Sequence, residues 1–321
     1  MEVNYGIDVL LTSSNVNWKN KRIALATNNA ALTKSGVPVR KALQDADFHL
    51  VKLFSPEHGI SAMGEDGKPM IDGIDSLTGL PIVSLYNHKL FPSQEDIIDV
   101  EIIVFDIPDC GARFYTYLWT MTYLLEICST YKIPFVILDR PNPLSGNLLK
   151  TEGPILNEIT ASFIGRFAIP VTHGCSFGEL ALYFNAIFKW QVTITVFACE
   201  NWKRSKYFTD TNLTFIPTSP AITSFNSMLL YPGLCFLEAT NVSEGRFTNH
   251  SFEAVAAPWL NEAKLIELLA IEFNDCLNFQ VTTKKTTEGK PNRKIFSRHK
   301  RKRLYRNRHH EPHQTQLQRH F

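Results

Sequence analysis

The sequence predicts an α/β fold in which a Rossmann-like, doubly wound and mostly parallel sheet is followed by a smaller α+β domain. Two observations support this prediction. Short apolar runs rich in β-branched residues alternate with stretches of helical periodicity, as in chains where each strand is followed by a crossover helix. Several of these runs are apolar throughout, which is typical of strands that are covered on both faces.

Strands and helices are expected in alternation along the chain. The apolar runs that we interpret as strands lie at residues 22–27, 48–54, 82–85, 101–106, 134–139 and 193–198. The helical stretches lie at about residues 34–46, 93–98, 116–131, 176–188 and, on an amphipathic pattern, 261–276. The first strand continues into Thr27-Asn28-Asn29-Ala30 rather than a GxGxxG turn. Nothing therefore supports a dinucleotide site, and no cofactor is expected.

Composition divides the chain into three parts. Residues 1–150 carry the strand–helix alternation and are expected to form the Rossmann-like catalytic domain. Residues 151–280 have long loops and are expected to form a second, incomplete domain that is the other wall of a cleft. Residues 281–321 hold 13 of the 33 Lys and Arg residues but 2 of the 31 Asp and Glu residues, and are expected to be a disordered basic tail.

Cysteine usage and the first residues suggest a location for the chain. The six cysteines stand singly, without a CxxC pair or a Cys/His metal spacing, so buried reduced thiols are expected and no metal site. The N-terminus lacks the basic and apolar regions of a signal peptide, and no run of 18 apolar residues occurs. As written, the chain is expected to be cytoplasmic without a membrane span, or periplasmic or secreted if translation starts elsewhere.

Polar clusters follow the predicted strands at the end where open α/β sheets bind their ligands. These clusters are SPEHG at 55–59, DIPDCGARFYTY at 106–117, DRPNP at 139–143 with EGP at 152–154, and His173-Gly174 with Glu179. Asp106 and Asp139 either cap the next helix or serve a site. Arg113 either pairs with Asp106 or Asp109, or binds a ligand.

Three glutamates in these clusters have different local explanations. Glu179 lies three residues after Ser176, so a helix capping box explains it without any catalytic role. Glu57 lies in a Pro-x-His-Gly turn, where local structure does not require a carboxylate, so we favour a functional role. Glu152 lies in a loop before Gly153-Pro154 and is interpreted in the same way.

The residues of these clusters suit the cleavage of a sugar acetal. That reaction needs one carboxylic acid to protonate the leaving oxygen and a second group to stabilise or capture the oxocarbenium-like centre. Aromatic platforms and planar hydrogen-bonding groups complete a sugar site. The candidates are Glu57, Glu152, Asp106, Asp109, Arg113, Tyr115, Tyr117 and Trp119. Another hydrolase, such as a deacylase with His58 or His173 as the base, would fit the same inventory.

Nine short motifs, in order from about residue 55 to 260, resemble the bacterial exo-β-N-acetylmuramidase family. They are SPEHG (55–59), TGLPIVSLY (78–86), FDIPDCGARFYTY (105–117), LDRPNPLSG (138–146), EGP (152–154), IPVTHGCSFGEL (169–180), YPG (231–233), EATNVSEGR (238–246) and APW (257–259). The resemblance implies an enzyme that removes N-acetylmuramic acid from the non-reducing end of peptidoglycan fragments. It also implies a cleft between two domains, with glutamates as the catalytic pair.

The resemblance assigns roles to residues of this chain. Glu57 would be the first catalytic glutamate and Glu152 the second. The pocket would be lined by His58, Asp106, Arg113, Tyr115, Asn142, His173, Asn241, Glu244 and Arg246. Arg113 or Arg246 would bind the lactyl carboxylate of muramic acid, because a guanidinium fork matches a carboxylate. The partner would be a muropeptide or another oligosaccharide that contains N-acetylmuramic acid, and no nucleic acid is expected.

The sequence departs from the family pattern at three places. Phe247 replaces a glycine, and Ala221 stands where we expect Asn. We expect the resemblance to end near residue 280, where the basic tail begins. The tail is a product of a shifted reading frame, a segment without a role, or a basic arm that binds nucleic acid or an anionic surface. In the first case the second domain would lack strands, and a further alternative is a non-catalytic or inactive, truncated remnant that binds muropeptides.

Overall fold

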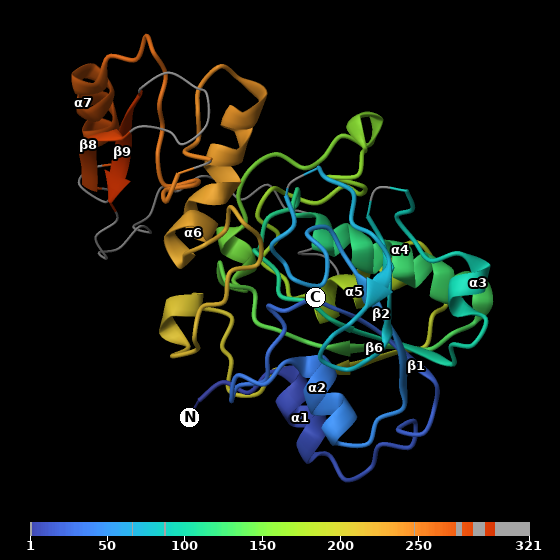
Figure 1. The fold of residues 1–321 in the computed structure, drawn as a ribbon. Coiled ribbons are helices and arrows are strands. Elements are labelled where there is room, and N and C mark those ends of the chain that lie inside the picture. Colours follow the sequence, from blue (N-terminus) through green and yellow to red (C-terminus); the bar gives the residue numbers. More distant parts are fainter. Residues whose placement is uncertain are drawn as a thin grey trace. The chain divides into compact units, whose positions relative to one another are not determined.

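The computed structural model describes residues 2–65, 67–86, 88–246, 248–273, 278–284 and 293–298. The chain divides into two compact units, the first running to Pro220 and the second starting at Ala221. Figure 1 shows the ribbon, coloured along the sequence.

A seven-stranded sheet forms the centre of the first unit. Its strands are β1 (Ile23–Thr27), β2 (Leu50–Ser55), β3 (Gly73–Ile74), β4 (Pro81–Ser84), β5 (Ile102–Asp106), β6 (Phe135–Leu138) and β7 (Ile194–Phe197). They lie in the order β3-β4-β2-β1-β5-β6-β7. All neighbours pair in parallel except β3 and β4, which are antiparallel. The predicted mostly parallel α/β sheet is confirmed.

The helices of this unit follow the predicted alternation. They are α1 (Gly6–Thr12), α2 (Val39–Asp45), α3 (Gln94–Ile97), α4 (Thr116–Tyr131) and α5 (Phe177–Ile187), with the short 3₁₀ turns η1 (Leu148–Lys150), η2 (Glu158–Thr160) and η3 (Phe208–Asp210). α4 has the predicted bounds and ends at Lys132, which adopts a left-handed conformation. α2 begins later than predicted because Gly36, at φ +86°, forms a turn and Pro38 starts the helix. α1 was not predicted.

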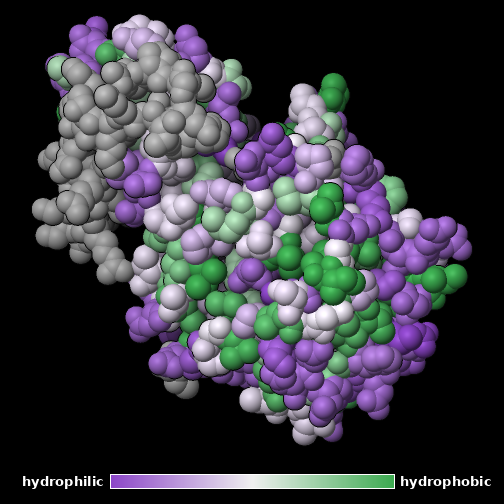
Figure 2. All heavy atoms as spheres, in the orientation of Figure 1, coloured by the Kyte–Doolittle hydropathy of each residue, from purple (hydrophilic) through white to green (hydrophobic). Residues whose placement is uncertain are grey.

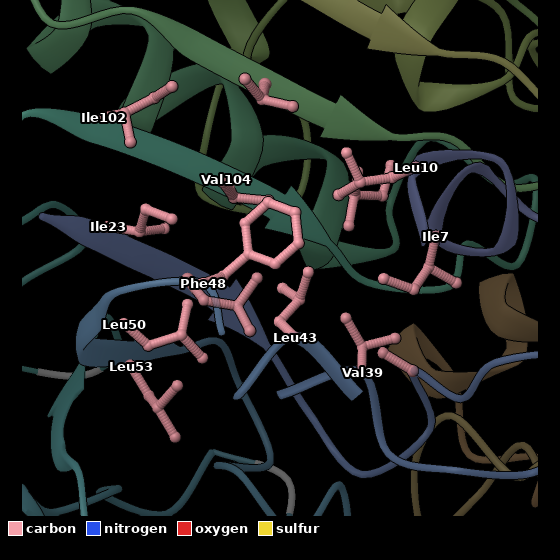
Figure 3. Packing of buried hydrophobic residues seen from close by; sticks show 14 of the residues in the cluster. Ile7, Leu10, Ile23, Val39, Leu43, Phe48, Leu50, Leu53, Ile102 and Val104 are labelled. Carbon is pink, nitrogen blue, oxygen red and sulfur yellow. The ribbon is translucent and has the colours of Figure 1, made fainter. Parts of the chain in front are cut away.

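Both faces of the sheet are buried, which explains the uniformly apolar strands. One face packs against α1 and α2 around Phe48, as Figure 3 shows. On the other face, the Phe105 ring of β5 contacts Phe135 and the first residue of α5, Phe177. Trp119 of α4 is fully buried and packs against Phe184 of α5. Residues of β1 are therefore excluded from water on every side.

The direction of winding reverses at β1. From β1 the chain builds outward through β2 to β4, and then crosses to β5 on the opposite side of β1. In open parallel sheets, ligands bind beyond the carboxyl ends of the strands at such a reversal. The loops after β1, β2 and β5 are therefore the expected location of the site.

The first unit extends further along the chain than the sequence suggested. The sequence placed the end of the Rossmann-like domain at residue 150, whereas the first unit runs to Pro220. The reason is that β7 pairs with β6 and completes the sheet. Long-range strand pairing, and not the change in composition near residue 150, determines the extent of this unit.

The second unit contains α6 (Phe225–Leu234), η4 (Cys235–Ala239), α7 (Glu262–Phe273), β8 (Asn278–Lys284) and β9 (Arg293–Arg298). β8 and β9 pair in antiparallel fashion. Residues 281–284 and 293–298 of the basic segment are therefore strands, and the expectation of a disordered tail is wrong for them. The remainder of that segment, and the end of the helix predicted at 261–276, lie outside the described residues.

Three further properties of the described residues bear on the environment of the chain. No helix among them is long and apolar enough to cross a membrane. The five cysteines that are described, Cys110, Cys128, Cys175, Cys199 and Cys235, are free thiols. Some large apolar side chains remain exposed, most of all Ile159 and Ile71. Figure 2 shows hydrophobic residues interspersed with polar ones on the face in view.

A buried ion pair fixes α2 to the β3–β4 hairpin. Arg40 Nε donates to Asp75 Oδ2 at 2.9 Å, and the two side chains are 6% and 4% exposed. Thr78 donates to the same oxygen through its backbone amide and its hydroxyl. Burial opposes the ionisation of Asp75, but the bonds from Thr78 and Arg40 outweigh it and hold the pKa of Asp75 below its ordinary value.

We expect Asp75→Asn to lower the free energy of unfolding by roughly 3 kcal/mol at pH 7, because Arg40 would keep an uncompensated buried charge. Since the folded-state pKa of Asp75 is depressed, its contribution is present above the unfolded-state pKa and is lost as the pH falls through the folded-state value. Urea unfolding at several pH values should therefore show the variant and the parent converging in acid. Asp45→Asn, which breaks the exposed pair with Lys41, is the matched control and should cost at most about 0.5 kcal/mol.

Candidate functional site

Glu57 lies in a tight turn directly beyond β2. The amide of Gly59 donates to the carbonyl of Pro56 at 3.0 Å, and both His58 and Gly59 adopt positive φ angles of 66° and 68°. A positive φ is unusual for a non-glycine residue, so surrounding contacts must hold His58 in place. Its Nδ1 lies 2.8 Å from the carbonyl oxygen of Gly64, and its ring is buried. The turn leaves Glu57 partly exposed at the carboxyl edge of the sheet.

Hydroxyl groups meet the Glu57 carboxylate. Thr116 Oγ1 donates to Glu57 Oε2 at 2.6 Å, and Thr116 is the first residue of α4. The carboxylate is thus placed at the positive end of a 16-residue helix. Burial, together with a hydrogen bond to Glu57, raises the pKa of Tyr86 to about 12. Within the described residues, no Lys or Arg forms an ion pair with Glu57.

The aromatic residues at the start of α4 are interior side chains. The Tyr115 and Tyr117 hydroxyls donate to Thr218 Oγ1 and to the Thr218 carbonyl, each at 2.7 Å. Trp119 donates through Nε1 to the carbonyl of Arg113 at 2.7 Å. All three rings are buried, so they support the loops of the edge and are not surface platforms for a sugar.

Asp106, at the end of β5, pairs with Arg140 inside the protein. Arg140 also donates to the carbonyl of Leu32 at 2.8 Å and lies over the ring of Tyr5. Burial raises the pKa of Asp106 to about 6, while Arg140 opposes the shift. Asp106 is fully buried, so it ties strand ends together and the alternative of a pair with Arg113 is not realised.

A second buried cluster joins Asp109, Asn142 and His173. His173 Nε2 lies 3.1 Å from Asp109 Oδ2, but the two atoms are not aligned for a hydrogen bond, and neither has another hydrogen-bond partner. Asn142 Nδ2 donates to the carbonyl of Cys175 at 2.9 Å. The cluster connects the loops that follow β5 and β6 with the start of α5.

Asp139 and Glu179 both contact the amino end of α5, which decides whether each caps a helix or serves a site. Asp139 accepts hydrogen bonds from the Gly178 amide at 3.0 Å and from Ser176 Oγ at 2.6 Å, so it binds the amino end of this helix. Glu179 closes the predicted capping box with Ser176. Both carboxylates therefore have local structural roles.

Arg113 holds the loop that carries Glu152. Its Nη1 donates to the carbonyls of Pro154 and Ile169, each at 2.6 Å. Glu152 is fixed by its backbone, which pairs with Thr172 in both directions. Its side chain remains exposed, yet desolvation by the surrounding loop raises the pKa of Glu152 above its ordinary value. Such a shift suits a carboxyl group that must stay protonated.

The remaining predicted residues belong to the second unit. Asn241 is exposed and Glu244 is buried. Arg246 donates to Glu238 at 2.7 Å and to Glu244 at 3.2 Å. Gly245 has a φ of +86° in this turn, and the Phe247 departure lies outside the described residues. Ala221, the other departure, is buried.

Three further residues lie at this edge, and no motif in the sequence had indicated a role for them. Thr116 and Tyr86 contact Glu57, and Asn28, which follows β1, is fully buried beside Tyr117. Asn28 Nδ2 has no hydrogen-bond partner of normal geometry, although the amide is close enough to lower the pKa of the Tyr117 hydroxyl. All three lie near the end of a strand or a helix, and this position is the signal by which they could have been found from the sequence. Among the described residues, no three His, Cys, Asp or Glu side chains are grouped as metal ligands.

Sequence comparison identifies relatives of the chain. Two profiles of one family match it, exo-β-N-acetylmuramidase NamZ, N-terminal, over residues 23–226, and exo-β-N-acetylmuramidase NamZ, C-terminal, over residues 229–317. The chain is 42% identical over 271 residues to the peptidoglycan β-N-acetylmuramidase NamZ of Bacillus subtilis (strain 168). That match covers 84% of this chain and 64% of the relative, so the chain spans less than two thirds of that protein.

Two crystal structures of DUF1343 family proteins from Bacteroides fragilis NCTC 9343 are also similar. The first has a TM-score of 0.83 and 30% identity, and the match covers 92% of this chain and 77% of that one. The second has a TM-score of 0.69 and 33% identity, with coverage of 81% and 69%.

The family match also bears on the basic segment. Because the C-terminal match runs to residue 317, the expectation that the resemblance ends near residue 280 is wrong. The match includes most of the segment whose composition had set it apart. The hypothesis that the tail is foreign to the family therefore loses its main support.

The loop that Arg113 holds provides a test of this geometry. We expect Arg113→Met to speed amide hydrogen exchange across residues 152–172 and to cost about 2 kcal/mol of stability, because two carbonyls would lose a charged donor. Arg22→Met is the matched control, since Arg22 donates to the Asp99 carbonyl from an exposed position. It should leave exchange in residues 152–172 unchanged. Equal exchange in parent and Arg113→Met would contradict the assignment.

Proposed function

The chain belongs to the exo-β-N-acetylmuramidase NamZ family, and on this premise we propose that it is a glycoside hydrolase. Its reaction would remove N-acetylmuramic acid from the non-reducing end of peptidoglycan fragments. The substrate would be a muropeptide or a related oligosaccharide. The Bacillus subtilis relative is named for the same activity, which supports the proposal.

The observation that carries the proposal is the environment of Glu57. Its carboxylate lies beyond a strand end at the helix amino terminus and accepts a 2.6 Å hydrogen bond from Thr116. The carboxylates of Asp106 and Asp139, at the ends of β5 and β6, are instead buried in structural contacts. Glu57 is partly exposed, so a substrate can reach it.

We assign different tasks to the two glutamates. Donated hydrogen bonds suit a carboxylate that works ionised, so Glu57 would stabilise the oxocarbenium-like centre, or orient the N-acetyl group if that group is the internal nucleophile. Glu152, whose pKa is raised, would protonate the leaving oxygen. His58, Asp106, Tyr115, Asn142 and His173 are buried, and they would keep the pocket in shape.

Arg113 is the better candidate for the lactyl carboxylate. Arg246 already contacts two glutamates, which compete with a carboxylate ligand. Arg113 donates to neutral carbonyls, and within the described residues no carboxylate pairs with it. Arg113 is buried, but no described carboxylate neutralises its positive charge, so an anionic group that reached it would be attracted. Asn241 and Glu244 lie in the second unit, and their part in substrate binding stays a prediction, as does recycling of imported fragments in the cytoplasm.

A chromogenic 4-nitrophenyl glycoside of N-acetylmuramic acid tests the function. We expect the parent to release nitrophenol and Glu57→Gln to lose roughly a thousandfold in kcat. Glu152→Gln should lose more activity on a disaccharide, whose leaving group is a sugar, than on the nitrophenyl glycoside, because nitrophenolate leaves without protonation. Glu65→Gln and Glu158→Gln, on exposed parts of the same two loops, are the matched controls.

Other outcomes of this assay would favour the rival functions. Release of acetate without release of nitrophenol would indicate a deacylase. Binding of the glycoside without turnover in the parent would indicate a non-catalytic muropeptide-binding protein. Full activity of Glu57→Gln would remove Glu57 from the reaction.

Paired substrates with and without the lactyl group test the arginine assignment. We expect Arg113→Lys to raise KM about tenfold for the muramic acid substrate and much less for the N-acetylglucosamine analogue, because Lys lacks the bidentate fork. Arg246→Lys should change both KM values equally. The ratio of the two changes in KM separates recognition of the lactyl group from distortion of the loop, because distortion would raise KM for both substrates alike.

A further inference from the structure

Tyr86 ends the motif TGLPIVSLY, and the proposed reaction gives it no task. β2 and β4 pair in parallel with Ser55 opposite Ser84, and the Leu85 amide donates to the Ser55 carbonyl at 2.8 Å. Glu57 and Tyr86 each follow these paired serines by two residues. The strand register therefore brings Glu57 and Tyr86 to the same level at the carboxyl edge of the sheet.

The Tyr86 hydroxyl lies close to Glu57. The carboxylate adds to burial in raising the pKa of this hydroxyl to about 12, and the backbone of Gly67 opposes the shift. A phenol beside a carboxylate can donate its proton to it. Thr116 Oγ1 binds the carboxylate as well. Two hydroxyls, which come from the ends of β4 and α4, thus converge on Glu57.

The ring of Tyr86 is also fixed. It packs against Phe163 with a centroid separation of 5.4 Å and an interplanar angle of 46°. Phe163 belongs to the segment that Arg113 fastens through the carbonyls of Pro154 and Ile169. The ring contacts Phe163, whereas the hydroxyl lies near Glu57. A substitution that removes the hydroxyl alone therefore leaves the packing of the ring in place.

We propose that Tyr86 is a positioning residue, whose hydroxyl acts with that of Thr116 to hold the Glu57 carboxylate in a single orientation. Carboxylate rotation would move the charge away from the reacting carbon, and small displacements are costly in such sites. A hydroxyl fixes the direction of the carboxylate and leaves its negative charge in place. A Lys or Arg would cancel much of that charge. The catalytic consequence rests on the proposed glycosidase function, whereas the contact itself does not.

Tyr86→Phe removes the hydroxyl and keeps the ring. We expect kcat on the nitrophenyl glycoside to fall about ten- to a hundredfold, with KM changed less than about twofold. Thr116→Val should act in the same way, and Thr116→Ser, which keeps the hydroxyl, should restore activity.

Tyr123→Phe is the matched control. Tyr123 lies on α4 and packs against Phe91 and Arg166, so the loss of its hydroxyl should change neither kcat nor KM. An unchanged kcat in Tyr86→Phe would overturn the proposal, as would a rise in KM alone. Thr116→Val carries the same test if Tyr86→Phe does not fold.

A double-mutant cycle on thermal unfolding tests the contact without any substrate. The effects of Tyr86→Phe and Glu57→Gln on stability should be non-additive, whereas those of Tyr123→Phe and Glu57→Gln should add. Additive effects in the first pair would overturn the proposal. Non-additivity together with no turnover by the parent would leave the contact in place and overturn the glycosidase function instead.

Discussion

The burial of β1 in the sheet is the constraint on which the first unit depends. This strand lies between β2 and β5, and every residue from Ile23 to Thr27 is excluded from water. Strands in such a position cannot carry polar side chains along their length without unmet hydrogen bonds. Polar groups therefore gather beyond the strand ends, and the reversal of winding at β1 brings several of these ends together.

Gathering polar groups at one edge of the sheet costs folding free energy, because most of these groups are buried there. The protein offsets this cost by pairing them. Asp106 binds Arg140, and Asp139 binds the amino end of α5. These pairs make a rigid frame from residues that a motif search would assign to catalysis. Glu57 differs from them, since it is partly exposed and its described partners are hydroxyls.

That difference has a chemical meaning for the proposed reaction. An oxocarbenium-like centre is stabilised by an uncompensated negative charge nearby. A cation beside Glu57 would hold its direction but cancel much of its field, whereas Thr116 and Tyr86 orient it and leave the charge in place. Glu152 has the complementary property, because desolvation favours its protonated form. One edge of the sheet can thus present two carboxyl groups in different environments.

The sequence by itself determined the alternation of strands and helices, the bounds of α4, the capping box of Glu179 and the family motifs, because all of these are local patterns of spacing. Only the tertiary structure decided that β7 completes the sheet, that Trp119 is buried, and that Arg113 donates to two loop carbonyls. It also placed Tyr86 beside Glu57, through the pairing of Ser55 with Ser84. These features depend on strand register and on packing between segments far apart in the chain, which local periodicity does not encode.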